Sequence, residues 1–294
     1  MASGASGRGV AMVMASAISF GLSPVFARMA YGEGVDVQGF LTARFILAFT
    51  AVGGYLAATR SIRPIPRRTM LSLVGLGAVG YFLQSSFYFT ALLYVPVPVV
   101  ALTLYTYPAL VTAAALLLRW ERASASLVGS LALALAGLAL VVGPVRGGSI
   151  VGVGLALGAA VSYTCYILFG SKVLEEVEGE VATFYVMGAA SVSFLLVGAA
   201  GGRLNFGWSE GGWSWVAITG LVSTAFAATA FFKGLKLVGP SKASIMSAME
   251  PAASVAAAWV AFGEALSAWQ WLGAAFILAA SAWVARSRKA YPEA

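Results

Sequence analysis

The 294-residue chain is 60% hydrophobic and only 10% charged, and its mean hydropathy is +0.89. Charged residues make up about a quarter of an ordinary soluble domain, so this composition excludes a water-soluble globular fold. It predicts an all-α protein that crosses a membrane several times. The net charge of +7 comes from basic residues that gather on one face of the membrane, as described below. No nucleic-acid partner is therefore expected.

Residue types that several chemistries need are missing from the sequence. It has one cysteine, Cys165, and no histidine. An intramolecular disulfide, a cysteine–histidine metal site and histidine-based catalysis are therefore excluded. No phosphate-binding loop of the Walker type is present, so ATP is not expected as the direct energy source. We expect no catalytic residues, no metal and no cofactor.

Apolar segments follow one another along the whole chain, each near the roughly 20 residues that a helix needs to cross the hydrocarbon core. The first is longer than the apolar region of a signal peptide, so we expect a retained transmembrane helix. Val95-Pro-Val-Pro98 predicts a tight turn, because two prolines so close rarely lie inside one helix. The ten predicted spans are residues 8–31, 37–59, 69–94, 97–118, 124–143, 150–172, 180–200, 213–237, 241–262 and 267–286.

The chain contains an internal repeat. Each copy has an apolar segment, a tight Gly/Pro turn, a second apolar segment with a proline, and a glutamate just past its end. Pro108 matches Pro251, and Glu121 matches Glu264, at the same offset of 143 residues. Each copy then holds five spans, and because five is odd the second copy must lie inverted relative to the first. Inverted repeats are typical of secondary transporters, which bind substrate near the midplane between the halves.

The basic residues predict the orientation. With the N-terminus inside, fourteen of the 18 Lys and Arg residues fall on the inner face. This bias predicts that both termini are cytoplasmic. The expected units are residues 1–148, with the N-terminus inside, and residues 149–294, with the C-terminus inside.

Both halves resemble the drug/metabolite transporter superfamily in its EamA-type form. The marks are the stretch from Pro96 to Trp120-Glu121 and the stretch from Gly239-Pro240 to Phe262-Gly263-Glu264. The chain is most similar to bacterial inner-membrane exporters of amino acids, including YddG-like exporters of aromatic amino acids. The resemblance implies a bundle of ten helices around a central cavity, alternating access, and a place in the bacterial inner (plasma) membrane.

The expected partners are a small-molecule substrate, such as an amino acid or a similar metabolite, and the lipid bilayer. Export of drugs, organic cations or nucleosides stays open as an alternative within the superfamily. A passive channel or a membrane scaffold stays open as a different class. The sequence leaves the oligomeric state undecided, with a monomer among the options.

Polar side chains inside the spans are costly in lipid and usually face the interior of the bundle. In the third span they recur at i, i+3, i+4 and i+7, which places them on one helical face that lines a cavity or bonds to neighbouring helices. Polar and aromatic residues also recur in the first, fourth, sixth and ninth spans. The expected cavity residues are Ser19, Ser23, Tyr81, Gln84, Ser85, Tyr88, Thr103, Tyr107, Tyr163, Tyr166, Ser244, Ser247 and Glu250.

Glu250 is the acid placed nearest the middle of the membrane, about 16 Å beyond the Gly239-Pro240 turn at 1.5 Å per residue. Proton coupling, a grip on a substrate ammonium, and a structural pair with Lys233 or with hydroxyls all remain open.

Four further residues carry structural expectations. Pro108 and Pro251 are expected to kink their helices in mid-span, as hinges or as static bends. Lys233 is expected to anchor its helix at the inner surface. Arg44 is expected to anchor at the outer surface or to pair with Glu33 or Asp36.

Overall fold

The computed structural model describes residues 2–59, 65–117, 125–142, 149–175, 177–202, 204–238, 246–247 and 249–287, and all regular secondary structure in these ranges is helical. No strand occurs in these ranges. The elements are α1 (Ala2–Gly32), α2 (Val37–Ala58), α3 (Arg67–Gly75), η1 (Leu76–Tyr81), α4 (Phe82–Ala91), α5 (Val97–Leu104), α6 (Tyr107–Leu117), α7 (Ala125–Val142), α8 (Ser149–Glu175), α9 (Gly179–Ala200), α10 (Glu210–Gly220), η2 (Leu221–Phe226), α11 (Ala227–Val238), α13 (Met249–Phe262) and α14 (Ala268–Ser287).

These elements form ten helical stretches. Six are long and apolar enough to cross a membrane, and the other four are shorter apolar helices. Composition and helix length together confirm an all-α membrane protein with several spans. The expected turn after the third span is present, because α4 ends at Ala91 and α5 begins at Val97.

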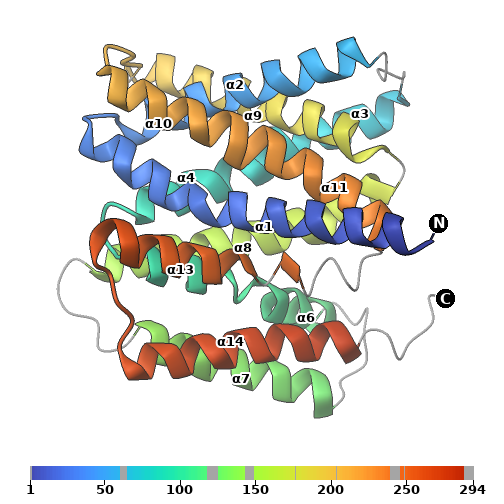
Figure 1. Cartoon of the computed structure of the whole chain (residues 1–294), viewed down its shortest axis with the longest axis vertical. Helices are drawn as coiled ribbons and strands as arrows, with labels where there is room; N and C mark the ends of the chain where they lie inside the picture. Colours follow the sequence, from blue (N-terminus) through green and yellow to red (C-terminus); the bar gives the residue numbers. More distant parts are fainter. Residues whose placement is uncertain are drawn as a thin grey trace.

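The helices lie side by side in one bundle (Figure 1). In its central part, α1 packs against α11 and α13, α2 against α9, and α4 against α8. The pair α7 and α14 forms one edge of the bundle (Figure 1). The first residue of α1 and the last residue of α14 lie at the same end of the bundle.

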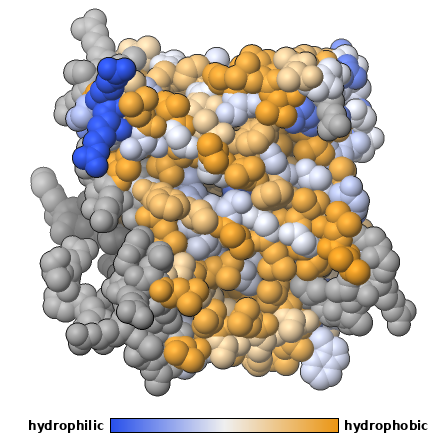
Figure 2. Space-filling view, turned by 180° about the vertical axis from the view of Figure 1, so that it is seen from behind, coloured by the Kyte–Doolittle hydropathy of each residue, from blue (hydrophilic) through white to orange (hydrophobic). Residues whose placement is uncertain are grey.

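Hydrophobic side chains cover most of the described surface on the face drawn in Figure 2. Large apolar residues such as Val79, Phe169 and Val260 are more than half exposed. In water such a surface would drive aggregation, whereas in a bilayer the lipid chains cover it.

Two of the stretches contain a π-helical turn. One turn is η1, between α3 and α4, and the other is η2, between α10 and α11. A π turn frees a backbone carbonyl from the α-helical pattern, and that carbonyl then needs another donor. Ser193 on α9 donates to the carbonyl of Ala78 at 3.1 Å, and Thr224 donates to the carbonyl of Thr219 at 2.9 Å. The two turns overlap when the repeat offset is applied.

A glycine brings each π-containing stretch close to a neighbouring helix. A Cβ added to Gly77 would lie 2.9 Å from both Val186 Cα and Ala189 Cβ on α9. A Cβ added to Gly220 would lie 3.0 Å from Leu47 Cβ on α2. Since the two glycines are repeat mates, the two halves share one mode of close helix packing.

Pro108 follows a break in its stretch and does not kink a continuous helix. α5 ends at Leu104, two residues form a turn, and Pro108 is the second residue of α6. The expectation of a mid-helix kink was therefore wrong for Pro108, which lies in the first turn of a helix, where the missing N–H has no intrahelical partner to lose. Pro251 is the third residue of α13, and a kink there stays a prediction.

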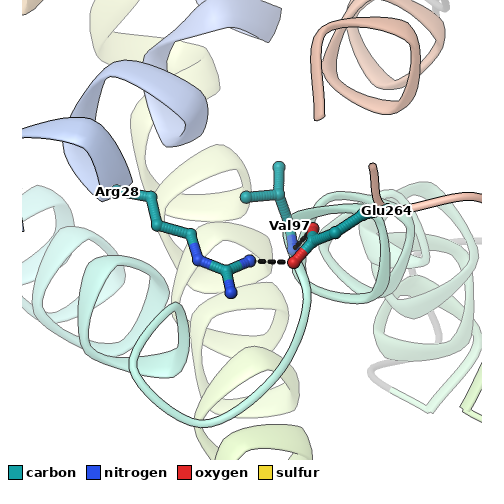
Figure 3. Close-up of polar contacts among 3 residues, drawn as sticks. All are labelled: Arg28, Val97 and Glu264. Carbon is teal, nitrogen blue, oxygen red and sulfur yellow. Dashed lines mark hydrogen bonds and ion pairs between the residues drawn. The ribbon is translucent and has the colours of Figure 1, made fainter. Parts of the chain in front are cut away.

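Glu264 joins three elements at the end of the bundle opposite the start of α1. Its carboxylate forms an ion pair with Arg28 of α1 and accepts a hydrogen bond of 3.0 Å from the backbone N–H of Val97, the first residue of α5 (Figure 3). Glu264 itself follows α13. The guanidinium of Arg28 also lies 5.0 Å from the ring centroid of Phe262. This junction holds α1, α5 and α13 together.

Candidate functional site

Five tyrosines from three stretches form a chain of ring contacts inside the bundle, here called the tyrosine cluster. The ring centroids are 5.9 Å apart for Tyr105 and Tyr107, 4.8 Å for Tyr107 and Tyr163, 5.9 Å for Tyr163 and Tyr166, and 5.7 Å for Tyr166 and Tyr81. Tyr81 is in η1, Tyr105 is in the break between α5 and α6, Tyr107 begins α6, and Tyr163 and Tyr166 are in α8. Of the predicted residues, Tyr81, Tyr107, Tyr163 and Tyr166 are thus brought together.

Glu250 lies at one end of the tyrosine cluster. It is the second residue of α13, and its Oε2 accepts a hydrogen bond of 2.9 Å from the hydroxyl of Tyr105. The same hydroxyl lies 2.7 Å from the backbone carbonyl of Ser247. Gly21 allows α1 to approach this turn, since a Cβ there would lie 2.8 Å from the Cβ of Ala253. The contact between Glu250 and the tyrosine cluster is therefore a hydrogen bond from the Tyr105 hydroxyl and not an ion pair with a basic residue.

Arg44 lies at the other end of the cluster and is only 3% exposed. Its Nε donates to Thr224 Oγ1 at 2.7 Å, and its guanidinium lies 4.5 Å from the ring centroid of Phe89 and 5.2 Å from that of Phe45. Its Nη1 is buried and has no hydrogen-bond partner. Among the described residues, the one ion pair is that of Arg28 with Glu264, so Arg44 has no carboxylate opposite it. A buried guanidinium without an anion is costly.

Aromatic residues connect the two charged ends. The rings of Phe45 and Tyr81 are 5.5 Å apart, and so the chain of contacts from Glu250 continues to the residue next to Arg44. Tyr88, the other predicted tyrosine, is buried on α4, and its ring centroid lies 5.2 Å from that of Phe89. The two charges are not hydrogen-bonded to each other. The site thus has a cationic end, an acidic end and tyrosines between them.

The remaining predicted residues are buried near this site or fall outside the description. Gln84 and Ser85 are buried on α4, where the Ser85 hydroxyl donates to Gln84 Oε1 at 3.1 Å. Ser19, Ser23 and Thr103 are buried on α1 and α5, and no hydrogen bond between described residues ties their hydroxyls to the tyrosine cluster. Ser244 lies outside the described residues, as do Trp120, Glu121, Gly239 and Pro240.

The expectation for Arg44 was wrong. Of the alternatives left open for Glu250, the structure contains a bond to a hydroxyl, that of Tyr105, and no pair with Lys233. Arg44 does not anchor at the surface, and the acids proposed as its partners bind elsewhere. Asp36 accepts from the backbone N–H of Gly39 at 2.8 Å, and Glu33 accepts from Ser209 at 2.7 Å. Lys233 contacts Tyr55 instead of Glu250. Sequence reasoning also missed Thr224 as a site residue, although the repeat offset carries Tyr81 onto Thr224.

The sequence profile of the EamA-like transporter family matches the chain twice, over residues 7–143 and over residues 150–286. The chain belongs to the EamA-like transporter family. An uncharacterized transporter from Archaeoglobus fulgidus is similar to this EamA-like protein, with 30% identity over 273 residues, covering 92% of this chain and 94% of the relative. A solved crystal structure shares the fold, with a TM-score of 0.64, 21% identity, and coverage of 96% of this chain and 99% of the other.

Family membership and the transporter-named relative make this EamA-like protein a transporter rather than an enzyme. The predicted resemblance to EamA-type transporters is confirmed. The likeness to exporters of aromatic amino acids stays a prediction. In this EamA-like chain the buried charges and the tyrosine cluster are the groups available to a transported molecule.

Proposed function

We propose that this EamA-like protein is a secondary transporter that exports amino acids with an apolar or aromatic side chain by alternating access. Its two five-helix halves, residues 1–148 and 149–294, lie inverted around a central cavity. The chain lies in a bacterial inner (plasma) membrane with both termini in the cytoplasm. The 143-residue repeat, the odd number of spans in each half and the distribution of Lys and Arg support this architecture.

The buried, anion-free guanidinium of Arg44 carries the proposal for the substrate. A substrate carboxylate beside its unpartnered Nη1 would supply the missing anion through a charge-assisted hydrogen bond. The substrate ammonium would lie at Glu250, and an aromatic or apolar side chain would lie against the tyrosine cluster. A zwitterionic amino acid is bound best by one cationic and one anionic group, and the site has one of each, Arg44 and Glu250.

The alternatives within the superfamily make different demands on the site. An organic cation would use Glu250 and the tyrosines but would leave Arg44 without an anion. A nucleoside would leave both charges without a counter-ion. Glu250 can also couple export to protons, and export can equally be downhill. A passive channel or a scaffold has no need of a bipolar site.

Counterflow into proteoliposomes tests the proposal with three matched compounds. Phenylalanine carries both charges, phenethylamine lacks the carboxylate, and phenylpropionate lacks the ammonium. We expect saturable counterflow of phenylalanine and at least tenfold weaker competition by the other two, because a hydrogen bond to a charged group contributes about 1.5–3 kcal/mol. Equal transport of phenethylamine would favour an organic-cation exporter, and a flux that does not saturate would favour a channel.

The Arg44→Gln variant should lower the affinity for phenylalanine roughly ten- to a hundredfold and leave that for phenethylamine unchanged. Arg68→Gln is the matched control, because Arg68 is an exposed basic residue at the start of α3. An equal loss for both compounds would show that Arg44 supports the fold and does not bind the carboxylate.

A further inference from the structure

A groove separate from the substrate site runs along the outside of the bundle between α1, α2 and the stretch η2–α11. Its volume is about 560 Å³. Its walls are mainly apolar and include Met12, Val52, Leu221 and Phe226. Leu221 and Phe226 are 45% and 49% exposed, so the groove opens towards the lipid. Its shape and chemistry suit a hydrocarbon chain.

One end of the groove is polar. Lys233 lies there, its Nζ donates to the hydroxyl of Tyr55, and it lies 4.4 Å from the Tyr55 ring centroid. An ammonium group has three donors, and a neutral phenol leaves its charge without a counter-ion. No carboxylate pairs with Lys233 among the residues that the structure describes.

This polar end lies where three helices reach the membrane surface. Tyr55 is in the last turn of α2, and Lys233 is in the second half of α11. A Cβ added to Gly234 would lie 2.9 Å from the carbonyl oxygen of Gly9, so the first turns of α1 are at the same depth. The exposed Arg8 of α1 adds a second positive charge at this end. A lipid headgroup lies at this depth when its acyl chain follows the groove.

We propose that this groove is a binding site for an anionic phospholipid, with the phosphate at Lys233 and the Tyr55 hydroxyl and an acyl chain along the apolar walls. Charge complementarity selects an anionic lipid over a zwitterionic one, because an unpaired ammonium near the surface attracts net negative charge. With the orientation proposed above, the lipid belongs to the cytoplasmic leaflet.

The lipid site shares an element with the substrate site. Leu221 and Phe226 of η2 line the groove, while Thr224 of the same π turn is bonded to Arg44. A lipid held against η2 therefore stabilises the turn that positions Arg44. Lipid composition then affects transport without any contact between lipid and substrate.

The test measures lipid binding to the purified full-length chain by native mass spectrometry and by thermal unfolding in nanodiscs of phosphatidylglycerol or of phosphatidylcholine. We expect tighter binding of phosphatidylglycerol and a higher unfolding temperature in it. Lys233→Gln should weaken that binding about fivefold, since one basic residue near the surface contributes about 1 kcal/mol. Arg68→Gln, which removes an exposed charge on α3, a helix that contributes no residue to the groove, should leave it unchanged.

Two further measurements distinguish a lipid held by its acyl chain and headgroup from phosphate held by charge alone. Ala51→Leu narrows the groove without removing a charge and should also weaken phosphatidylglycerol binding. Inorganic phosphate alone should give no stabilisation, because it lacks the acyl chain. Equal binding of the two lipids by the unaltered protein, an equal loss in Arg68→Gln, or stabilisation by free phosphate would each overturn the proposal. These readouts do not involve transport, so they stand or fall independently of the proposed function.

Discussion

Replacing Gly77 by alanine tests whether the close packing of η1 on α9 determines stability. A Cβ at this position would lie 2.9 Å from Val186 Cα and from Ala189 Cβ, whereas carbon atoms at optimal separation are about 3.5–4.0 Å apart. The backbone carbonyl oxygen of Val186 would be nearer still, and all three contacts are with the backbone of α9 or with the Ala189 Cβ, which has no freedom to rotate away. The helices must therefore move apart by roughly 0.6–1 Å, which forfeits a quarter to a half of the attraction at that crossing.

The expected magnitude combines two opposing effects. Overpacking a close crossing costs about 1–3 kcal/mol. Alanine in place of glycine in a helix returns about 0.5–1 kcal/mol, because the unfolded chain loses less conformational freedom. We expect a net destabilisation of about 1–2 kcal/mol for Gly77→Ala. Gly220→Ala should cost less, because its nearest contacts are at 3.0 Å.

The assay is thermal unfolding of the purified protein in one detergent, followed by intrinsic tryptophan fluorescence. Gly54→Ala is the matched control: Gly54 is also inside a helix, but an added Cβ there would meet nothing within 4 Å. Its unfolding temperature should stay the same or rise. If Gly77→Ala is as stable as Gly54→Ala, the crossing of η1 and α9 has room for a methyl group, and its close packing does not determine stability.

Four other outcomes are expected. Glu250→Gln should weaken substrate affinity in counterflow by about tenfold or more; intact counterflow with loss of transport driven by a pH gradient would assign the residue to proton coupling instead. Tyr105→Phe removes a 2.9 Å hydrogen bond to that carboxylate and should lower stability by about 1–3 kcal/mol, and an unchanged unfolding temperature would show that the bond contributes nothing. Glu264→Gln removes the ion pair of Figure 3. A cysteine introduced between the two halves should then react faster with a thiol reagent applied from outside. An unaltered rate would show that the ion pair of Arg28 and Glu264 does not hold the outer end of the bundle closed. In a Cys165→Ser background, Arg288→Cys should react only with reagents applied from the cytoplasmic side, and labelling of intact cells by an impermeant reagent would reverse the orientation.

The spans were predictable because burial in lipid leaves a direct mark on composition. The π turns were not. Residues 76–81 and 221–226 are apolar, glycine- and serine-containing segments that are equally compatible with an α-helix. What makes η1 tolerable is Ser193, more than 100 positions away, which donates to the carbonyl of Ala78. A local pattern cannot reveal a partner that only tertiary packing brings near.

The sequence predicted some of the residues that the structure brings together. The four tyrosines brought together were found because polar residues within apolar spans stand out. The expectation for Arg44 was wrong because a long basic side chain in the first half of α2 can also reach the surface. Which way its side chain points depends on the packing of α2 against η2. Tyr105 is absent from the expected cavity residues, because the break after Leu104 that turns it towards Glu250 is not visible in the apolar pattern.

The π turns also restrict how the length of these helices can change. Hydropathy alone tolerates one residue more or fewer in a membrane span, because the length changes by only about 1.5 Å. A π turn holds one residue more than the α-helical turn that it replaces. A deletion within η1, for example of Val79, would therefore close the wide turn to an α-helical one and leave Gln84 and Tyr88 facing the interior. A deletion elsewhere in the same span would instead rotate everything after it by about 100° about the helix axis. In η2 the wide turn also carries Thr224, which bonds to Arg44, so closing that turn would disturb the bond. These two spans therefore have one place each where the helix can lose a residue and keep its register, although nothing in their hydrophobicity marks that place.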